Sequence, residues 1–468
     1  MSLYQELAGQ FISEIEQGAR YVGSKMPSLR QLAKQQGISM TTALNCYQEL
    51  ESRGWIEARP KTGYFVSSRH IDSNTPEWAH FTSIVTQVDL SSHQQSPNAS
   101  GPLGMANMPN DALSVTELER SFRRSIKRMG ERINDYPEPQ GDLGLRQSLA
   151  AHFSSSGLVV APQDWVVTSG CMMAIKMALM ALTKPGDTVA ISSPCYNGIL
   201  ALLGQLERNI IEIPSLDEGI DLRQLEHHFQ LGEVKAAVFC TTHMNPQGIT
   251  MSPAQKQRLA RLANQYRIPV IEDDVYAELS HGGPMPLPAK YYDRDGYIIW
   301  CGSITKSVSP SYRLGWCVPG RFLDRFCEQF VSGTDGVALP IQLAIRDFID
   351  SGQYSKHLKR RQHCLVQLKE AYLSYLRTHL PASVNISQPL GGMVLWLQIP
   401  GLDAEKLDRL LNQHALDIRG GRLFSTLDLY INCVRVNFGY ELTPKCKRDL
   451  VNLVDAINSS IEPMAMDV

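Results

Sequence analysis

The sequence has no Cys-x-x-Cys pair and no long uninterrupted hydrophobic run. Its ten cysteines are scattered along 468 residues, and several lie within apolar segments. Closely spaced cysteines are typical of disulfide scaffolds and zinc sites, so their absence favours reduced, mostly buried thiols and no metal site. The longest apolar run, residues 171–182, is interrupted by Lys176 and is too short to span a bilayer. We therefore expect a cytoplasmic protein that does not associate with membranes.

The sequence also lacks an excess of charge of either sign. Its 45 basic side chains nearly balance 47 acidic ones, for a net charge of −2. The molecule as a whole is therefore no polycation, and contact with nucleic acid must come from a local basic surface. Residues 1–6 show neither the basic nor the apolar region of an export signal. The length corresponds to roughly three domains, and the apolar content of 43% is ordinary for a globular protein.

The first 66 residues have the pattern of three helices followed by a β-hairpin. Apolar periodicity and capping residues predict helices over residues 3–17, 27–37 and 39–53. Segments rich in β-forming residues, 55–59 and 63–66, flank a Pro-Lys-Thr turn. Two short helices joined by a turn that contains glycine are typical of a helix-turn-helix, and the hairpin is interpreted as its wing.

Residues 3–66 resemble the winged helix-turn-helix domain of GntR-type bacterial regulators. The matching residues are Pro27-Ser28-x-Arg30-x-Leu32-Ala33, Ser39-x-Thr41-Thr42, Tyr47-x-x-Leu50, Gly54-Trp55-Ile56 and Gly63-Tyr64-Phe65-Val66. No acidic residue occurs between Ala19 and Gln48, which suits an approach to phosphates. The family often has an arginine where Met40 stands. We therefore expect operator DNA to be contacted by Arg30, Ser39, Thr41, Thr42, Asn45, Lys61 and Gly63. The alternative is a protein–protein adaptor of the same fold.

The segment that follows is polar and interrupted by prolines. Its composition predicts a linker over residues 68–100, with a short apolar arm at 81–90, between a DNA-binding domain at 1–67 and a body at 101–468. A helix is predicted over residues 117–132, with five basic side chains on one face. That face is interpreted as solvated, and a second phosphate-contact stripe is the alternative.

Strands alternate with helices through the first part of the body. Predicted strands at residues 165–168, 188–192, 236–240, 268–272, 297–301 and 314–318 indicate a mostly parallel α/β sheet with right-handed crossovers. Small and polar residues follow several strands, at the edge where such sheets bind ligands. Long helices and later strands predict a smaller α+β subdomain at about residues 340–468.

One lysine stands in a distinctive stretch, Trp300-Cys301-Gly302-Ser303-Ile304-Thr305-Lys306-Ser307. An apolar strand delivers Lys306 into a hydroxyl-rich turn, and Arg313 follows seven residues later. A desolvated lysine has a lowered pKa and can form a Schiff base, and an arginine can pair with a phosphate. The stretch suggests pyridoxal 5′-phosphate (PLP) as cofactor. A surface lysine in a Ser/Thr loop is the plain alternative.

Together with Asp-x-x-Tyr at 273–276 and Asn-Pro-x-Gly at 245–248, this stretch makes residues 100–460 resemble the fold type I aminotransferases. The resemblance implies that Lys306 forms the Schiff base and that Asp273 (or Asp274) pairs with the pyridine nitrogen. It also implies contacts to three other parts of the ligands. Tyr276 and Asn245 hydrogen-bond the phenolic oxygen of the cofactor ring, and Tyr196 stacks on the face of that ring. The phosphate is held by Ser169, Gly170, Cys171, Ser303, Arg313 and Tyr136 of a partner subunit in a homodimer. A substrate carboxylate is bound by Arg435, with Asn245 nearby.

A GntR-type head joined to an aminotransferase-like body resembles the MocR subfamily of GntR regulators. The resemblance implies a cytoplasmic bacterial transcriptional regulator, associated with the nucleoid when it binds DNA, that senses an amino acid or amine through an aldimine at Lys306. Two alternatives remain: an active PLP-dependent aminotransferase with an appended DNA-binding head, and a DNA-binding scaffold whose body only dimerises.

Overall fold

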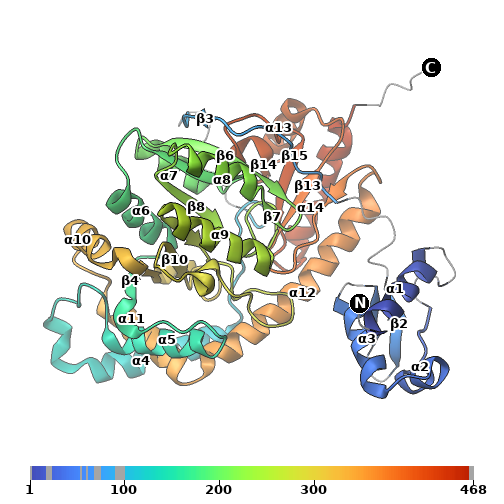
Figure 1. Ribbon diagram of the computed structural model, residues 1–468, viewed down its shortest axis with the longest axis horizontal. Coiled ribbons are helices and arrows are strands. Elements are labelled where there is room, and N and C mark those ends of the chain that lie inside the picture. The colour runs from blue at the N-terminus through green and yellow to red at the C-terminus, as the bar shows by residue number, and fades with distance from the viewer. Residues whose placement is uncertain are drawn as a thin grey trace. The chain divides into compact units, whose positions relative to one another are not determined.

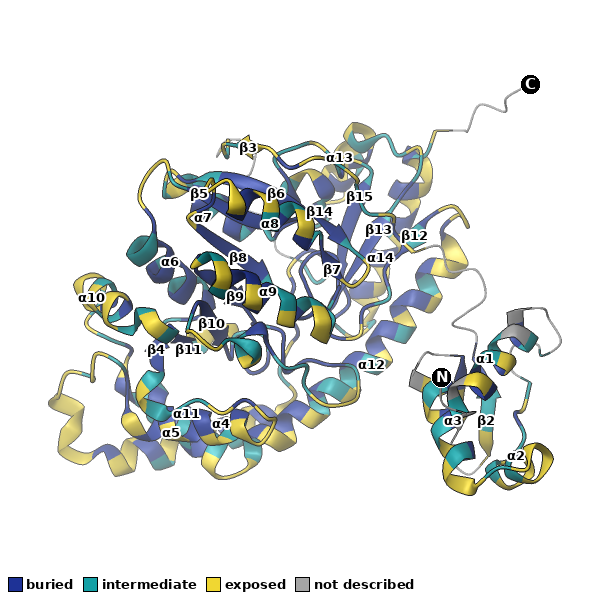
Figure 2. Cartoon of the chain, in the orientation of Figure 1, coloured by how far each residue is buried: buried dark blue, intermediate teal, exposed yellow. Residues whose placement is uncertain are grey.

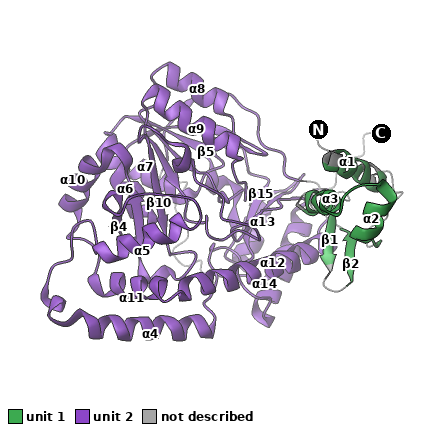
Figure 3. Ribbon diagram, turned by 60° about the horizontal axis from the view of Figure 1, so that its bottom comes forward, with its two compact units in different colours: residues 1–74 green, residues 75–468 purple. Residues whose placement is uncertain are grey.

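The computed structural model describes residues 3–16, 20, 24–52, 55–59, 62–67, 75–89 and 101–462. The chain divides into two compact units, residues 1–74 and residues 75–468 (Figure 3). The second unit thus begins inside the segment that the sequence analysis treats as a linker. Residues 75–89 belong to it because Trp78 Nε1 donates to Asp217 Oδ1 over 3.0 Å and β3 (Val85–Thr86) pairs with a strand of the large sheet.

The N-terminal unit has the predicted helices and hairpin. They are α1 (Leu3–Glu16), α2 (Leu29–Gln36), α3 (Met40–Ser52), β1 (Ile56–Arg59) and β2 (Gly63–Val66). Ser28 and Gln31 form a capping box at the start of α2, and Gly37 ends that helix in the left-handed conformation with φ 64°. Buried side chains from all three helices and the hairpin form one core, which includes Phe11, Tyr47 and Trp55. The unit therefore has a hydrophobic core of its own.

The body is built on a nine-stranded sheet (Figure 1). Its order is β3-β6-β5-β8-β9-β10-β11-β4, with the short β7 (Gly219–Ile220) paired to β6. The strands are β4 (Val166–Thr168), β5 (Thr188–Ser193), β6 (Asn209–Leu216), β8 (Ala236–Cys240), β9 (Val270–Asp273), β10 (Ile298–Ser303) and β11 (Gly315–Val318). From β6 to β10 neighbouring strands are parallel, whereas β11 is antiparallel to both of its neighbours. The expected, mostly parallel sheet is confirmed, although β6 and β7 were not predicted.

Helices cover both faces of this sheet, whose strands are almost entirely buried (Figure 2). One face packs on α6 (Cys171–Leu182), α7 (Asn197–Gln205) and α10 (Leu323–Gly333). The other packs on α5 (Leu143–Ser154), α8 (Leu222–Gln230), α9 (Pro253–Tyr266) and α11 (Leu339–Asp350). Because side chains alternate along a strand, Ile271 faces α6 whereas its neighbour Val270 faces the opposite layer. This alternation decides which residues reach the site described below.

A four-stranded antiparallel sheet forms the smaller part of the body. Its order is β12-β13-β15-β14, with β12 (Asn385–Ile386), β13 (Val394–Gln398), β14 (Arg419–Gly420) and β15 (Cys433–Asn437). Its core also contains residues of α12 (Gln353–His379), α13 (Ala404–Gln413) and α14 (Pro444–Ser460). Helix α11, assigned to this subdomain from the sequence, instead packs on α5 and α4 (Ala112–Met129). The small subdomain therefore begins within α12 rather than near residue 340.

The basic face of α4 is largely ion-paired. Arg124 and Arg128 both contact the carboxylate of Asp347 on α11, at 2.6 and 3.1 Å. Arg120 pairs with Glu117, and Arg123 pairs with Glu119. These pairs support the interpretation of a solvated face over that of a phosphate-contact stripe. No helix within the described ranges is long and apolar enough to cross a membrane.

An aromatic cluster supports the sheet beneath α5, and its loss has a predictable cost. The indole of Trp165 is fully buried, 5.5 Å from Trp300 and 5.9 Å from Phe153 between ring centroids. We expect Trp165→Ala to lower the free energy of unfolding of the body by about 3–5 kcal/mol, because it leaves a cavity. Urea titration followed by circular dichroism measures this loss. The control Leu390→Ala removes a side chain that is 71% exposed and should stay within about 0.5 kcal/mol of the parent. Equal shifts in both variants would contradict the expectation.

Candidate functional site

The ends of β9 and β10 place two polar side chains on the face of the sheet that α6 covers. Asp273 is the last residue of β9, two positions after Ile271, and its Cα is paired with that of Cys301 on β10. Ser303 lies two positions after Cys301 and so points the same way. The thiol of Cys171, the first residue of α6, donates to Asp273 Oδ1 over 3.1 Å. The strand ends and the start of α6 therefore form one cluster.

The structure separates the two adjacent carboxylates, either of which the sequence could assign to the cofactor nitrogen. Asp273 accepts from Cys171 and, at 3.3 Å, from the backbone of Val275, with both bonds on Oδ1. Burial raises its pKa, and the two hydrogen bonds oppose this effect. Asp274 instead accepts from the indole of Trp300 over 2.8 Å, within the aromatic layer on the other face. Only Asp273 lies on the side of α6.

Lys306 follows β10 in a turn and is half-buried. Its Nζ donates to Ala106 O over 2.6 Å and lies 5.9 Å from the centroid of the Tyr276 ring. Burial lowers the pKa of Lys306 from 10.5 to about 8. The positive charge of Arg435 adds to this effect, and the carboxylate of Asp273 opposes it. A substantial fraction of the amine is therefore neutral near physiological pH and can act as a nucleophile.

Tyr276, Asn245 and Arg435 form a connected, buried group. Asn245 Nδ2 donates to the Tyr276 hydroxyl over 3.5 Å, and Arg435 donates to Asn245 Oδ1 over 2.9 Å. A second nitrogen of Arg435 donates to Gly104 O, while its Nε is buried without a partner among the described residues. Burial lowers the pKa of Arg435 to about 10. A buried guanidinium with an unused donor suits a carboxylate ligand.

The start of α6 is a cradle for an anion. Gly170 precedes the helix with φ 96° and provides no side-chain cap, so the first backbone N–H groups have no partner within the helix. A Cβ at Gly170 would lie 2.7 Å from Arg313 Nη2, which donates to Ser169 O over 3.2 Å. Ser303 is buried nearby, and Thr305 Oγ1 is buried with no hydrogen-bond partner among the described residues. An uncapped helix start, an arginine and hydroxyl groups fit a phosphate.

Of the two tyrosines predicted to contact the cofactor besides Tyr276, Tyr196 lies near the cluster and Tyr136 does not. Tyr196 is half-buried at the start of α7, and Arg435 and Asp273 both act on its hydroxyl electrostatically. Burial is the main cause of the raised pKa of Tyr196. Tyr136 is 86% exposed on the surface of the subunit. It does not join the cluster within one chain, so its predicted role needs a partner subunit.

Of the residues expected at DNA, Ser39, Thr41, Thr42 and Asn45 lie at or near the start of α3, Arg30 lies on α2, and Gly63 lies in the hairpin. Ser39 Oγ accepts from Thr42 N over 3.0 Å and so caps the helix, and it lies 2.9 Å from the Thr42 hydroxyl. Thr41 and Arg30 are exposed, Asn45 is half-buried, and Gly63 begins β2 with φ 107°. Lys61 lies outside the described residues.

Sequence reasoning missed several residues that position the lysine turn. A ring nitrogen of His357 on α12 lies 2.6 Å from Ser307 O, and the hydroxyl of Tyr354 lies 3.3 Å from that of Ser307. These residues come about fifty positions after Lys306 and belong to no local motif. The backbone carbonyls of Gly104 and Ala106 were missed too, because no residue type identifies a carbonyl that contacts a lysine or an arginine.

Two family models match this chain. Residues 102–452 match the model of the family described as aminotransferase class I and II, and residues 3–66 match that of the bacterial regulatory proteins of the gntR family. The chain therefore belongs to the class I and II aminotransferase family and, through its N-terminal segment, to the gntR family, the combination of MocR-type regulators.

Individual relatives extend along almost the whole chain. The uncharacterized HTH-type transcriptional regulator YjiR of Escherichia coli K12 is 31% identical over 472 residues, which cover 99% of this chain and 100% of the relative. YdcR of the same organism, with the same description, is 33% identical over 449 residues, or 94% of this chain and 96% of the relative. The solved kynurenine aminotransferase of Pyrococcus horikoshii has a TM-score of 0.70 at 24% identity. The match covers 78% of this chain and 91% of that one, and establishes the fold.

The lowered pKa of Lys306 predicts an unusual pH dependence of its reactivity. We expect acetylation of Lys306 by acetic anhydride, followed by peptide mass spectrometry, to reach half its maximal rate near pH 8 rather than 10.5. In Asp273→Asn the midpoint should fall by about one pH unit, because the carboxylate that favours the ammonium form is gone. Asp274→Asn is the matched control and should leave the midpoint unchanged. A midpoint near 10.5 in the parent protein would contradict the desolvated environment.

Proposed function

We propose that the protein is a PLP-binding, DNA-binding transcriptional regulator of GntR and MocR type that responds to an amino acid or amine in the bacterial cytoplasm. The observation that carries this proposal is the presence of both parts in one chain. A GntR-family segment precedes a body in which a half-buried lysine lies near a tyrosine ring and is acted on electrostatically by a buried carboxylate and by the arginine beside the anion cradle. Relatives that share both parts are described as HTH-type transcriptional regulators.

The residues present fit PLP. When bound, its aldehyde forms a covalent C=N bond with an amine, and its ring withdraws electrons from that bond. Lys306 would provide the amine and Arg313, Ser303, Ser169 and residues 170–171 would hold the phosphate. Asp273 would keep a proton on the ring nitrogen, which would offset the cost of burying its carboxylate. Tyr276 and Asn245 would bond the ring oxygen, and Tyr196 would cover the ring face.

Binding of operator DNA would use the exposed side of α3 and the region around Gly63. Thr41 is exposed there and Arg30 is exposed at the start of α2, whereas the hydroxyl of Thr42 is engaged with that of Ser39. Arg20 is engaged with Glu14 at 2.5 Å and lies over the ring of Phe11. The phosphate contacts would therefore come from Arg30 and Lys34 rather than from every cation in the acid-free stretch.

A homodimer would complete the site and pair two heads. Tyr136, exposed in one subunit, would reach the phosphate of the partner's cofactor. An amino ligand that takes the place of Lys306 would shift the body between two arrangements, and the linker would pass this shift to the heads. Such a ligand acts only through its difference in affinity for the two arrangements.

Transamination is a second candidate function. The cluster of Asp273, Tyr276, Lys306 and Arg435 is the set that the resemblance assigns to aminotransferases, and nothing in its geometry prevents a proton transfer by Lys306. Conversion of an added 2-oxo acid to its amino acid by the loaded protein, with a second amino acid as donor of the amino group and its own 2-oxo acid as coproduct, would establish this activity.

Covalent attachment gives the direct test of the cofactor. We expect incubation with PLP and reduction by borohydride to add one pyridoxyl group, which peptide mass spectrometry locates on Lys306. Lys306→Ala should lose the label while keeping its circular dichroism spectrum. Lys256→Ala is the matched control, because Lys256 is a buried lysine of α9, on the face of the sheet opposite α6, where it bonds Thr242 and Leu287 O. Labelling of another lysine at equal yield would reject the assignment of Lys306.

The salt dependence of DNA binding tests the head. With a duplex that the protein selects from random sequence, Arg30→Ala should weaken binding and reduce the slope of log K against log salt by about one, because one phosphate contact is lost. Arg20→Ala should leave the slope unchanged, since Arg20 is paired within its own domain. Fluorescence anisotropy at several salt concentrations measures both. Equal slopes for the parent and Arg30→Ala would exclude a phosphate contact by Arg30.

A further inference from the structure

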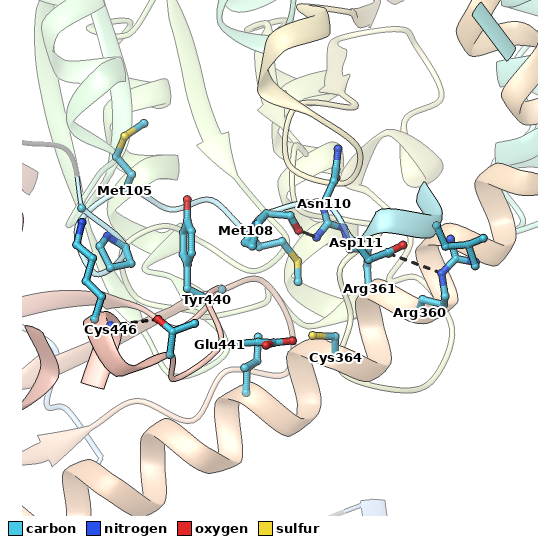
Figure 4. Close-up of a pocket in the computed structure, with 18 residues that line it drawn as sticks. Met105, Met108, Asn110, Asp111, Arg360, Arg361, Cys364, Tyr440, Glu441 and Cys446 are labelled. Carbon is cyan, nitrogen blue, oxygen red and sulfur yellow. Dashed lines mark hydrogen bonds and ion pairs between the residues drawn. The ribbon is translucent and has the colours of Figure 1, made fainter. Parts of the chain in front are cut away.

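A cavity of about 800 Å³ lies beside α12 in the body (Figure 4). Its walls come from residues 101–113, from α12 and from residues 439–446, which connect β15 to the first turn of α14. Lys306, Asp273 and Arg435 do not line it, so it is distinct from the candidate site described above. Small-molecule sites typically have volumes of roughly 300–1,000 Å³. The cavity is therefore large enough for a ligand of its own.

Apolar side chains form much of the cavity wall. Met105 and Leu113 both line it and are 51% and 52% exposed, although both are large and apolar. Pro102, Leu368 of α12 and Tyr440 line it as well. Exposed apolar side chains that gather around a hollow are typical of a ligand-binding surface, because a bound ligand removes them from water. One part of the ligand is therefore apolar.

Two adjacent arginines of α12 provide positive charge at this cavity. Arg361 is only 3% exposed, yet it donates to two uncharged acceptors, Pro109 O and Asn110 Oδ1. Its Nε and the Nε of Arg360 are both buried without a hydrogen-bond partner among the described residues. Burial of a guanidinium is costly unless an anion balances its charge. Among the described residues, no anion hydrogen-bonds to Arg361.

The acidic groups at the cavity do not fully balance its cations. The charged residues that line it are three cations and two carboxylates: Arg360, Arg361, Lys445, Asp111 and Glu441. Asp111 lies 3.7 Å from Arg360 Nε and also accepts from the backbone and the hydroxyl of Ser114. Burial lowers the pKa of Arg361 to about 10, although the charge of Asp111 opposes this effect. Figure 4 shows the two arginines and Asp111 at one end of the cavity, away from Met105. That end suits one additional negative charge.

We propose that this cavity is a second binding site, which takes a small amphipathic anion with an apolar body and one carboxylate or similar oxyanion. The anionic group lies at Arg360 and Arg361, and the apolar body covers Met105 and Leu113. A cationic ligand of the same shape is disfavoured, because the two arginines repel it. The site does not depend on the role assigned to Lys306, which lies outside the cavity.

Cys364 reports occupancy of the cavity directly. It lines the cavity and is half-buried, whereas the half-buried Cys327 of α10 does not line it and is the control thiol. We expect octanoate, an aliphatic chain with one carboxylate, to slow alkylation of Cys364 by iodoacetamide and to leave Cys327 unchanged, as measured by peptide mass spectrometry. Octanol and octylamine should need about tenfold higher concentrations for the same protection, because they lack the charge-assisted bond. Equal protection by all three compounds would overturn the proposal. Alkylation of Cys364 that slows as the protein alone is concentrated would do so too, since a second copy would then cover the cavity.

Three variants of the full chain separate the charge of the cavity from its volume. Glu441→Gln removes an exposed carboxylate that lines the cavity, so octanoate should bind roughly threefold more tightly in isothermal titration calorimetry. Cys364→Phe fills part of the cavity and should weaken binding by at least about tenfold, because the apolar chain loses its place. Cys327→Phe is the matched control and should bind octanoate as the parent does. Circular dichroism verifies that each variant is folded. No heat of binding with the parent, or equal affinity in Cys364→Phe and Cys327→Phe, would reject this site and leave the assignment of Lys306 untouched.

Discussion

Several cationic side chains lie close together at the buried edge of the large sheet, and the rest of the site depends on which negative groups balance their charge. Arg435 and Arg313 both act electrostatically on Lys306, and Lys306 and Arg435 have lowered pKa values because burial disfavours their charged forms. Asp273 is the carboxylate that opposes this effect at Lys306. Such an arrangement is stable only if anions or oriented dipoles complete it. A phosphate at α6 and a carboxylate at Arg435 would do so, beside the carbonyl dipoles of Gly104 and Ala106.

The arrangement follows from ordinary sheet geometry, which is why much of it could be predicted from the sequence. Parallel strands end at one edge, so residues that follow β9 and β10 must meet there. The period of two along β9 directs Asp273 toward α6 and turns Glu272 away. The motif around Lys306 and the strand-turn-helix at 166–171 are local patterns, and local patterns are visible in a single sequence. The same holds for the capped helices of the head, where Ser28, Gly37 and Ser39 mark the boundaries.

What could not be predicted depends on contacts between distant parts of the chain. Asp273 and Asp274 are equivalent in the sequence, and they are distinguished by their partners, Cys171 on α6 for Asp273 and Trp300 on the neighbouring strand for Asp274. Helix α11 has the periodicity of any amphipathic helix, so its packing on α4 rather than on the small sheet had no local signal. The cationic stretch of the head suggested several phosphate contacts, yet Arg20 is turned to Glu14 on α1. A residue pattern does not show which backbone carbonyls make contacts, because every residue has one.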